Sequence, residues 1–155
     1  MEFEAFFRSE YQRIFRCSCI VAGSREIAMD ATQEAFHRAY VRWRRLEKEP
    51  WTSGWVLTTA TNLCKRELEK NRRELNLVEE TLESTGPGLS GARVDTMRAL
   101  QQLPFRQRQA TVLHYLGDLP LPAIATLMGI TEGAVKAHLA HARRALRKTL
   151  EVVDD

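Results

Sequence analysis

The chain has 155 residues, enough for one domain or two small ones, and its 44% apolar content excludes a protein that is disordered throughout. Its 23 basic and 20 acidic residues leave a net charge of +3, so any binding to nucleic acid must depend on where the basic residues lie. No apolar run approaches the roughly 18 residues of a membrane span, and "MEFEAFFRSEY" lacks the basic region of a signal peptide, so we expect a cytoplasmic protein without a membrane segment.

Apolar residues recur at helical spacing from the N-terminus onward, and alternating strand patterns are nearly absent. A first helix is expected over residues 2–20, with an apolar side made of Phe3, Phe6, Phe7, Tyr11, Ile14 and Phe15. Ser24 is predicted to cap a second, long helix that ends near Leu46. The inward side of that helix comprises Ala28, Thr32, Ala35, Phe36, Ala39, Trp43 and Leu46. Its outward side comprises Asp30, Gln33, Glu34, His37 and Arg38.

A loop is predicted at "EKEPWTSG", residues 47–54, because a proline and a glycine punctuate it. Thr52 or Ser53 can cap the helix that follows over residues 55–73. One face of this helix comprises Val56, Ala60, Leu63 and Cys64. The residues that fall away from this face are Trp55, Asn62, Lys65 and Arg66.

This third helix ends in a basic cluster, which comprises Lys65, Arg66, Lys70, Arg72 and Arg73. Trp51 and Trp55 stand at the start of the same segment. Basic residues beside aromatic ones suit contact with the phosphates and bases of a single strand. A solvated basic face explains this stretch equally well, so both interpretations stay open.

After residue 75 the composition changes, and residues 76–93 are acidic and rich in glycine, which predicts a flexible linker. The fold class is therefore all-α, with two small helical domains at residues 1–75 and 94–155. The second domain contains four apolar stripes, each predicted to belong to a helix. These stripes are Met97, Leu100 and Leu103; Val112, Leu113 and Leu116; Leu121, Ile124, Leu127 and Met128; and Val135, Leu139, Ala142, Leu146 and Leu150.

The last two stripes form a predicted helix-turn-helix. A short helix over residues 121–128 precedes Gly129, which can adopt the left-handed turn conformation. Thr131 can cap the next helix, and Glu132 suits its positive N-terminus. The corner between the two helices is predicted to be filled by Ile130 and Val135. This arrangement lets the second helix enter a major groove of DNA.

The outward face of that second helix has a centre of mostly small residues between charged flanks. The centre comprises Gly133, Ala137, Ala140 and Arg144. The flanks comprise Lys136, Arg143 and Arg147 on one side and His141 and Lys148 on the other. Such a face suits phosphate contacts with a few base contacts. A merely solvated basic face is the weaker interpretation, because turn, cap and charge placement agree.

Few residues suggest metal binding or catalysis. Cys17 and Cys19 could hold a metal only with a distant histidine, and no second ligand pair is present. With Cys64 they make three cysteines, an odd number that cannot all pair, which is typical of a reduced intracellular protein. "GPGLSG", residues 86–91, matches a dinucleotide-binding glycine pattern, but no predicted strand precedes it. We therefore expect no metal, no cofactor and no enzymatic activity, and an enzyme or metal-binding protein is the least favoured class.

Three segments in order resemble the extracytoplasmic-function (ECF, group 4) sigma factors of bacterial RNA polymerase, in the sigma-70 family. "AMDATQEAFHRAYVRW" is similar to the family's polymerase-binding helix, and "GWVLTTATNLCKREL" to its promoter-melting helix. The segment "ALQQLPFRQRQ" to "ARRAL" is similar to sigma domain 4. The three motifs together, in this order and without a middle domain, are highly specific. The resemblance covers almost the whole chain.

The resemblance implies an alternative sigma factor that binds core RNA polymerase, selects promoters and helps to melt the −10 element. Contacts with the clamp coiled coil and flap tip of polymerase would fall to Asp30, Gln33, Glu34, Phe36, Arg38, Leu100, Leu103 and Leu116. Contacts with the melted −10 strand would fall to Trp51, Thr52, Ser53, Trp55, Asn62, Lys65, Arg66, Arg72 and Arg73. Contacts with the −35 duplex would fall to Thr131, Glu132, Lys136, Ala137, His138, His141, Arg143 and Arg144. An anti-sigma factor is a further possible partner.

The sequence departs from the family's pattern in the −35 region. The family usually has threonine where Ala134 stands, and arginine where His138 and His141 stand. These changes predict weaker and more pH-sensitive −35 binding. The alternative to a sigma factor is a dimeric helix-turn-helix regulator of the response-regulator output type, which shares the "GITEGAVKAH" wording. Against it, the N-terminal half lacks the strand–helix alternation of a receiver domain.

Overall fold

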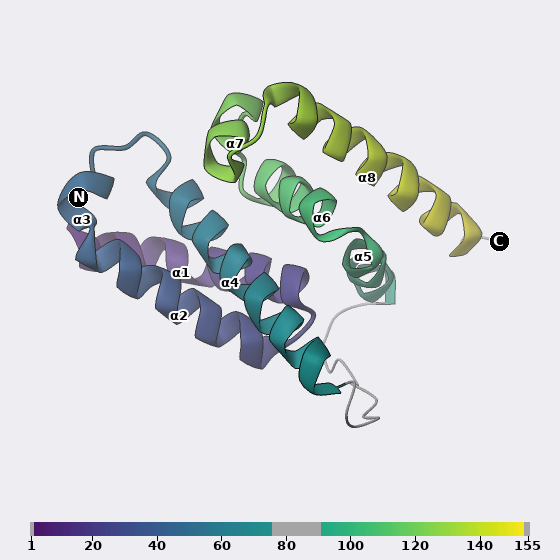
Figure 1. Ribbon diagram of the computed structural model, residues 1–155, viewed down its shortest axis with the longest axis horizontal. Coiled ribbons are helices and arrows are strands. Elements are labelled where there is room, and N and C mark those ends of the chain that lie inside the picture. The colour runs from purple at the N-terminus through teal and green to yellow at the C-terminus, as the bar shows by residue number, and fades with distance from the viewer. Residues whose placement is uncertain (1, 76–90, 154–155) are drawn as a thin grey trace.

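The computed structural model describes residues 2–75 and 91–153, and within these ranges every regular element is a helix (Figure 1), which confirms the all-α prediction. The N-terminal lobe contains α1 (Phe3–Ala22), α2 (Arg25–Val41), α3 (Trp43–Leu46) and α4 (Thr52–Leu75). The C-terminal lobe contains α5 (Gly91–Gln102), α6 (Phe105–Thr111), the π-helix η1 (Val112–Leu116), α7 (Leu121–Met128) and α8 (Glu132–Val153). The predicted linker and the glycine pattern at 86–91 lie mostly outside the described residues, and α5 already begins at Gly91.

The junction between α1 and α2 follows its sequence signals. Gly23 has a left-handed φ of 67°, and its N–H closes the helix on the Cys19 carbonyl. The hydroxyl of Ser24 accepts a hydrogen bond from the Ile27 N–H at 3.3 Å, so the predicted cap is confirmed. The predicted single helix to Leu46 was wrong, because the backbone leaves helical geometry at Arg42 and α3 is a separate turn.

The expectation that Thr52 or Ser53 caps the third helix was also wrong. Helix α4 begins at Thr52 itself, so both hydroxyls lie inside its first turn. Thr52 donates to the carbonyls of Leu46 and Glu49, at 2.7 and 2.9 Å, and thereby fastens the loop to the end of α3. Ser53 donates to the carboxylate of Glu10 at 3.1 Å.

An aromatic cluster fills one end of the N-terminal lobe. Phe36 of α2 is 2% exposed and lies 5.0–5.9 Å, between ring centroids, from Phe6, Phe7 and Tyr11 of α1. Trp43 of α3 lies 5.0 Å from Phe6. These tilted and edge-on contacts are the favoured geometries for aromatic rings. They hold α1, α2 and α3 together at that end of the lobe.

The helix-turn-helix formed by α7 and α8 agrees with its prediction in each local detail. Gly129 has a φ of 69°, and Thr131 accepts a hydrogen bond from the Ala134 N–H at 3.0 Å. Val135 is fully buried and Ile130 is partly buried at the corner between the helices. The inward positions of α8 are buried or half-buried as far as Leu150.

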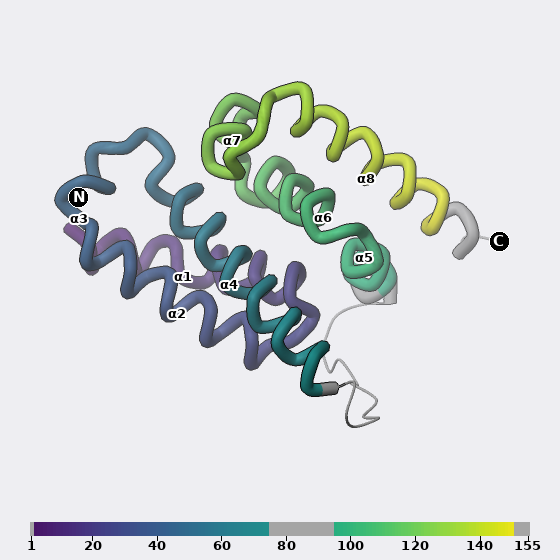
Figure 2. Tube along the Cα trace, in the orientation of Figure 1, coloured from purple at the N-terminus to yellow at the C-terminus, as the bar shows by residue number. Residues whose placement is uncertain are grey.

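The two lobes pack against each other over one continuous apolar core. The cluster joins buried side chains of α1, α2 and α4 to those of α6, η1, α7 and α8. Helix α4 contacts both α6 and α7, and Figure 2 shows it between the remaining N-terminal helices and the C-terminal lobe. The lobes approach closely at Gly54, where an added Cβ would lie 2.9 Å from Leu119 and 3.0 Å from Leu127. A glycine at this position therefore lets α4 and the helix-turn-helix meet.

Candidate nucleic-acid and polymerase interfaces

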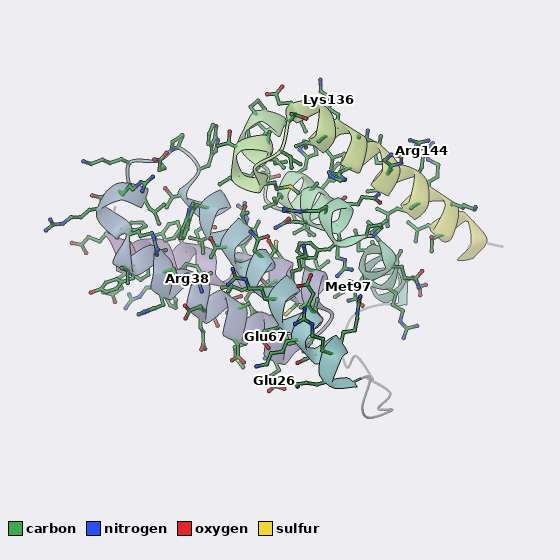
Figure 3. The ribbon with its side chains drawn as sticks, in the orientation of Figure 1. Glu26, Arg38, Glu67, Met97, Lys136 and Arg144 are labelled. Atoms are coloured by element: carbon green, nitrogen blue, oxygen red, sulfur yellow. The ribbon has the colours of Figure 1, made fainter. Side chains whose placement is uncertain are left out.

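The predicted −35 face of α8 is open to solvent. In Figure 3 Lys136 and Arg144 project from α8 away from the other helices. The exposed members of the predicted set are Thr131, Glu132, Lys136, Ala137, His141, Arg143 and Arg144, and His138 is half-buried. Arg143 donates a hydrogen bond to the hydroxyl of Tyr115 at 3.1 Å, so a residue outside the helix-turn-helix orients one of its arginines. Tyr115 was not among the predicted site residues.

The predicted −10 face of α4 borders the C-terminal lobe, whose helix α6 contacts two of its side chains. The Asn62 carbonyl oxygen accepts a hydrogen bond from the Gln109 amide at 2.8 Å. The Lys65 ammonium lies 5.4 Å from the centre of the Phe105 ring, within the range of a cation–π contact. Arg66, Arg72 and Arg73 are exposed on the same helix. Part of the predicted strand-binding surface is therefore engaged by α6 and part of it is free.

A pocket of about 370 Å³ lies where the loop before α4 meets α7. Its lining comprises Arg42, Arg45, Leu46, Glu49, Trp51, Trp55, Thr126 and Leu127. Two tryptophans and two arginines around one hollow suit a flat, electron-rich group such as a nucleobase. Thr126 and Leu127 belong to the C-terminal lobe, so the pocket in this arrangement has a wall that the N-terminal lobe does not supply.

Gln109 is the central polar residue between the lobes, and the sequence analysis did not single it out. Its side chain is fully buried, and its amide donates to Thr61 at 2.9 Å as well as to Asn62. Its carbonyl oxygen accepts from Arg106 at 3.1 Å. Both amide hydrogens are thus used on α4, as a buried amide requires. The available sequence signal was a polar residue at helical spacing from Leu113 on the apolar stripe.

Two arginines also join the lobes through backbone carbonyls. Arg13 of α1 donates to the Gly117 carbonyl at 2.6 Å. Arg108 of α6 donates to the Val21 carbonyl, near the C-terminus of α1. The second guanidinium nitrogen of Arg108 bonds two carbonyls at the end of its own lobe, those of Gln101 and Leu103, at 2.9 and 3.1 Å. Burial lowers the pKa of Arg108 from its ordinary value.

The predicted polymerase-binding face of α2 is exposed at Asp30, Gln33 and Glu34. Glu34 pairs with Arg38 at 3.0 Å, one helical turn away, and both side chains remain accessible. Phe36 is different, because it is buried in the aromatic cluster and presents no surface to a partner. Its place in the motif is therefore explained by packing of the lobe, which corrects the expectation of a direct contact.

Two of the three leucines predicted to contact the flap tip are buried in this arrangement, and the third is exposed. Leu100 and Leu103 are 8% and 4% exposed, because they pack on Ile20 of α1 and on Ala142 and Leu146 of α8. The expectation that they present an apolar surface is therefore corrected for this arrangement. Leu116 is 42% exposed. The wide turn of the π-helix rotates this side chain out of the stripe that α-helical spacing predicts.

The three cysteines pack in or against the apolar core. Cys17 and Cys64 are buried free thiols, and burial raises their pKa values to about 11 and about 12. No group of three potential metal ligands occurs among the residues the structure describes. Within the same residues no helix is long and apolar enough to cross a membrane.

Comparison with known proteins assigns both lobes. The family described as "Sigma-70 region 2" matches residues 6–74, and "Sigma-70, region 4" matches residues 93–146. The Mycobacterium tuberculosis ECF RNA polymerase sigma factor SigL is 32% identical over 150 residues, which cover 89% of this chain and 82% of SigL. SigM of the same species is 29% identical, over 96% of this chain and 76% of SigM. SigW of Bacillus subtilis is 28% identical, over 89% of this chain and 83% of SigW.

A solved structure also shares the fold. RpoE of Bartonella quintana, in complex with the anti-sigma factor NepR, superposes with a TM-score of 0.79 over 97% of both chains at 19% identity. The likeness spans α1 to α8 and so includes both lobes. With the two family regions in order and a relative above 30% identity, the chain belongs to the ECF RNA polymerase sigma factors of the sigma-70 family.

Proposed function

We propose that this protein is an alternative sigma factor that binds core RNA polymerase, directs it to specific promoters and helps to melt their −10 element. The main support is the pairing of a region 2 lobe with a region 4 lobe in one chain. Sigma factors are initiation factors rather than enzymes, so the protein needs no catalytic centre of its own. Its place of action is the cytoplasm, together with polymerase.

The two DNA elements fall to different lobes. The exposed basic face of α8 would read the −35 duplex, with Lys136 and Arg144 at phosphates or base edges. The tryptophan-lined pocket and the face of α4 around Asn62 would hold the melted −10 strand. Two weak contacts carried on one chain reinforce each other when both elements are present at the right spacing.

Two protein partners follow from the same assignment. The polar face of α2 at Asp30, Gln33 and Glu34 would dock on the clamp coiled coil of polymerase, where complementary charge sets orientation. The region around Leu116, with Leu100 and Leu103 once uncovered, would meet the flap tip. An anti-sigma factor is a proposed further partner, since the structural relative RpoE was solved in complex with the anti-sigma factor NepR.

The competing assignment, a dimeric helix-turn-helix regulator, is not favoured. It explains α7 and α8 but gives no role to the N-terminal lobe, which matches sigma region 2 over residues 6–74. One simple binding measurement distinguishes the two assignments. A regulator binds operator DNA alone, whereas a sigma factor must bind core polymerase.

Run-off transcription with core polymerase and fragmented genomic DNA tests the proposal. The complete chain should form a complex with core enzyme and yield transcripts from a limited set of promoters, which sequencing of the products would identify. Arg144→Ala should reduce this yield severalfold, because it removes a cation from the −35 face. Arg8→Ala, which removes an exposed arginine paired with Glu4 on α1, is the matched control and should leave the yield unchanged. Failure of the wild-type chain to bind core polymerase would overturn the assignment.

A further inference from the structure

The π-helix η1 presents Tyr115 at the surface beside the DNA-reading helix α8. The Gly117 N–H bonds the Val112 carbonyl at 2.9 Å, five residues back, which is the wide turn of a π-helix. A Cβ at Gly117 would lie 2.6 Å from the Leu113 carbonyl oxygen, so a glycine at this position lets the turn close. Tyr115 is 50% exposed within this turn. Single π turns often occur at functional sites, so we asked what this tyrosine could bind.

Contacts on two sides hold the ring and the hydroxyl of Tyr115. His114 packs edge-on against the ring, with centroids 4.8 Å apart. The Nδ1 of His114 lies 3.0 Å from the Leu119 carbonyl oxygen, and Nδ1–H must be the donor because a carbonyl only accepts. On the other side, the Tyr115 hydroxyl accepts a hydrogen bond from Nη1 of Arg143 at 3.1 Å. Arg143 is thereby oriented before it meets a ligand, which reduces the entropy lost on binding.

The flank of α8 that contains Arg143 is placed for phosphate contacts. Lys136, Arg143 and Arg147 are spaced by seven and four residues, so they lie on one side of the helix, and all three are exposed. An α-helix with its side chains is about 10–12 Å wide, and the major groove of DNA is about 12 Å wide. The flanks of a helix that lies in this groove therefore face the phosphate backbones, while its centre faces the bases.

We propose that Tyr115 and Arg143 together form a phosphate clamp at the edge of the −35 face. The inference rests on the proposed function, since it adds a contact to the same duplex-binding face. The hydroxyl that accepts from Arg143 keeps its own hydrogen, which it can donate to a phosphate oxygen. The guanidinium of Arg143 keeps further N–H groups for the same phosphate. A cation on α8 and a neutral donor on η1 then bind one phosphate from two helices.

The chemistry of this pair favours an anion as its ligand. Arg38 on α2 is paired with the carboxylate of Glu34 at 3.0 Å, which offsets its positive charge. Arg143 is held instead by a neutral hydroxyl, so its full charge remains available to a phosphate. Tyr115 and Arg143 are both exposed, so water can replace their hydrogen bond in the free chain and the bond adds little to folding stability. Its larger effect is therefore expected in binding.

The test measures the binding of duplex DNA to the full chain without polymerase. The probe is a fluorescein-labelled duplex that the wild-type chain enriches from a pool of short random duplexes. Tyr115→Phe removes the hydroxyl and keeps the ring against His114, and it should weaken binding about fivefold. Arg143→Ala should weaken binding about tenfold. The double variant should bind at most about twofold less tightly than Arg143→Ala, because both residues act on one phosphate.

Neutral phosphates show whether a phosphate is the ligand. Methylphosphonates replace the phosphates of the probe one at a time. At one position this change should weaken binding by the wild-type chain about tenfold, and binding by Arg143→Ala at most about twofold. A role of Tyr115 in folding alone gives no such dependence on one phosphate. Thermal unfolding of each variant shows separately whether the fold is kept.

Tyr40→Phe serves as the matched control, because it removes the same hydroxyl from an exposed tyrosine on α2, outside the α7–α8 motif. It should bind every probe as the wild-type chain does. Tyr115→Glu gives a second, independent test with the opposite sign. Its carboxylate repels a phosphate, so the methylphosphonate at the sensitive position should strengthen binding by this variant. If Tyr115→Phe does not fold, Tyr115→Glu decides the question.

Four results would overturn the inference. They are a Tyr115→Phe chain that binds as wild type, losses for Tyr115→Phe and Arg143→Ala that add in full, a methylphosphonate series without a sensitive position, and a wild-type chain that enriches no duplex. None of them concerns binding to core polymerase, which is the test of the proposed function. The two failures are therefore distinguishable.

Discussion

Gln109, Arg13 and Arg108 show how much of this molecule depends on single polar side chains. Each bonds a carbonyl or amide group on the opposite lobe, over sequence separations of 47 to 104 residues. Such partners cannot be read from local sequence, because helical spacing gives the face of a residue but not what lies opposite. The sequence therefore predicted which side chains of α8 are exposed but assigned Asn62 and Lys65 to DNA without their protein partners.

His141 offers a test of the −35 face at the residue scale. His141→Arg restores the charge that the family usually has at this exposed position, so it should strengthen binding to promoter duplex at low salt. The plot of log affinity against log salt concentration should become steeper by about one unit, as expected for one more phosphate contact. Fluorescence anisotropy over a salt series measures both effects.

The control for this prediction is Gln12→Arg, which adds the same charge to an exposed position of α1. It should change the slope much less, because α1 does not face the duplex. Equal slopes for the two variants would show that net charge alone acts, and would remove His141 from the −35 interface.

The buried thiols predict a loss of stability in alkaline solution. Burial raises the pKa of Cys64 from 9.0 to about 12, so the folded state keeps the thiol while the unfolded chain ionises above pH 9.0. The unfolded state then binds fewer protons, and the free energy of unfolding falls as pH rises through this window. The loss from this one group should be about 1 kcal/mol between about pH 9 and pH 10.

Thermal unfolding of the wild-type chain and of Cys64→Ala over this pH range checks the prediction. Other groups titrate there too, so the informative quantity is the difference between the two slopes. Cys64→Ala will start less stable, because it leaves a small cavity. Its stability should nevertheless fall less steeply, and parallel curves would contradict the assigned cause.

At the scale of elements, the sequence predicted best those features that local chemistry decides. Gly129 and Thr131 have their expected turn and cap, because both effects act within a few residues. The break at Arg42 and the π-helix before Gly117 were missed, because α-helical spacing assumes a constant number of residues per turn. The π-helix matters for the candidate interfaces, because it places Leu116 and Tyr115 at the surface.

The turn of the helix-turn-helix can be tested with two glycines in one motif. Gly129→Ala should lower the free energy of unfolding by about 1 kcal/mol, because φ is 69° there. Nothing lies within 4 Å of the added Cβ, so the cost comes from the backbone alone. Urea unfolding followed by circular dichroism measures it.

Gly133→Ala is the matched control for this prediction. It makes the same change four residues later, in the first turn of α8, where the added Cβ meets only Thr131 at 3.9 Å. It should leave stability unchanged or raise it by up to about 1 kcal/mol. A similar loss in both variants would mean that crowding or exposure, rather than backbone conformation, limits these positions.

At the scale of the whole molecule, the two lobes share one apolar core, which the sequence had divided at a linker. The apolar stripes predicted for each lobe are present, but several of their members face the other lobe. Leu127 against Gly54 is the clearest example. A stripe indicates that a face is buried without indicating in which lobe the covering surface lies.

The shared core predicts a single cooperative unfolding transition. All three tryptophans lie between residues 43 and 55, so their fluorescence reports the N-terminal lobe, whereas far-UV circular dichroism reports helices of both lobes. The two signals should give the same urea midpoint for the wild-type chain. Gln109→Ala should separate the midpoints, because it weakens the contact between the lobes. Two resolved midpoints in the wild-type chain would argue against a stable contact between the lobes.

The position of Asn62 between Gln109 and the predicted strand has a consequence for genetics. Its carbonyl oxygen accepts a hydrogen bond from Gln109 in the structure, and on the proposed function the same side chain holds DNA, so the contact between the lobes and the capture of DNA compete for it. Asn62→Ala would weaken both, and the losses would offset each other in the amount of transcript produced. A screen that scores only promoter output would then rank Asn62 as dispensable, although its side chain takes part in both states of the molecule.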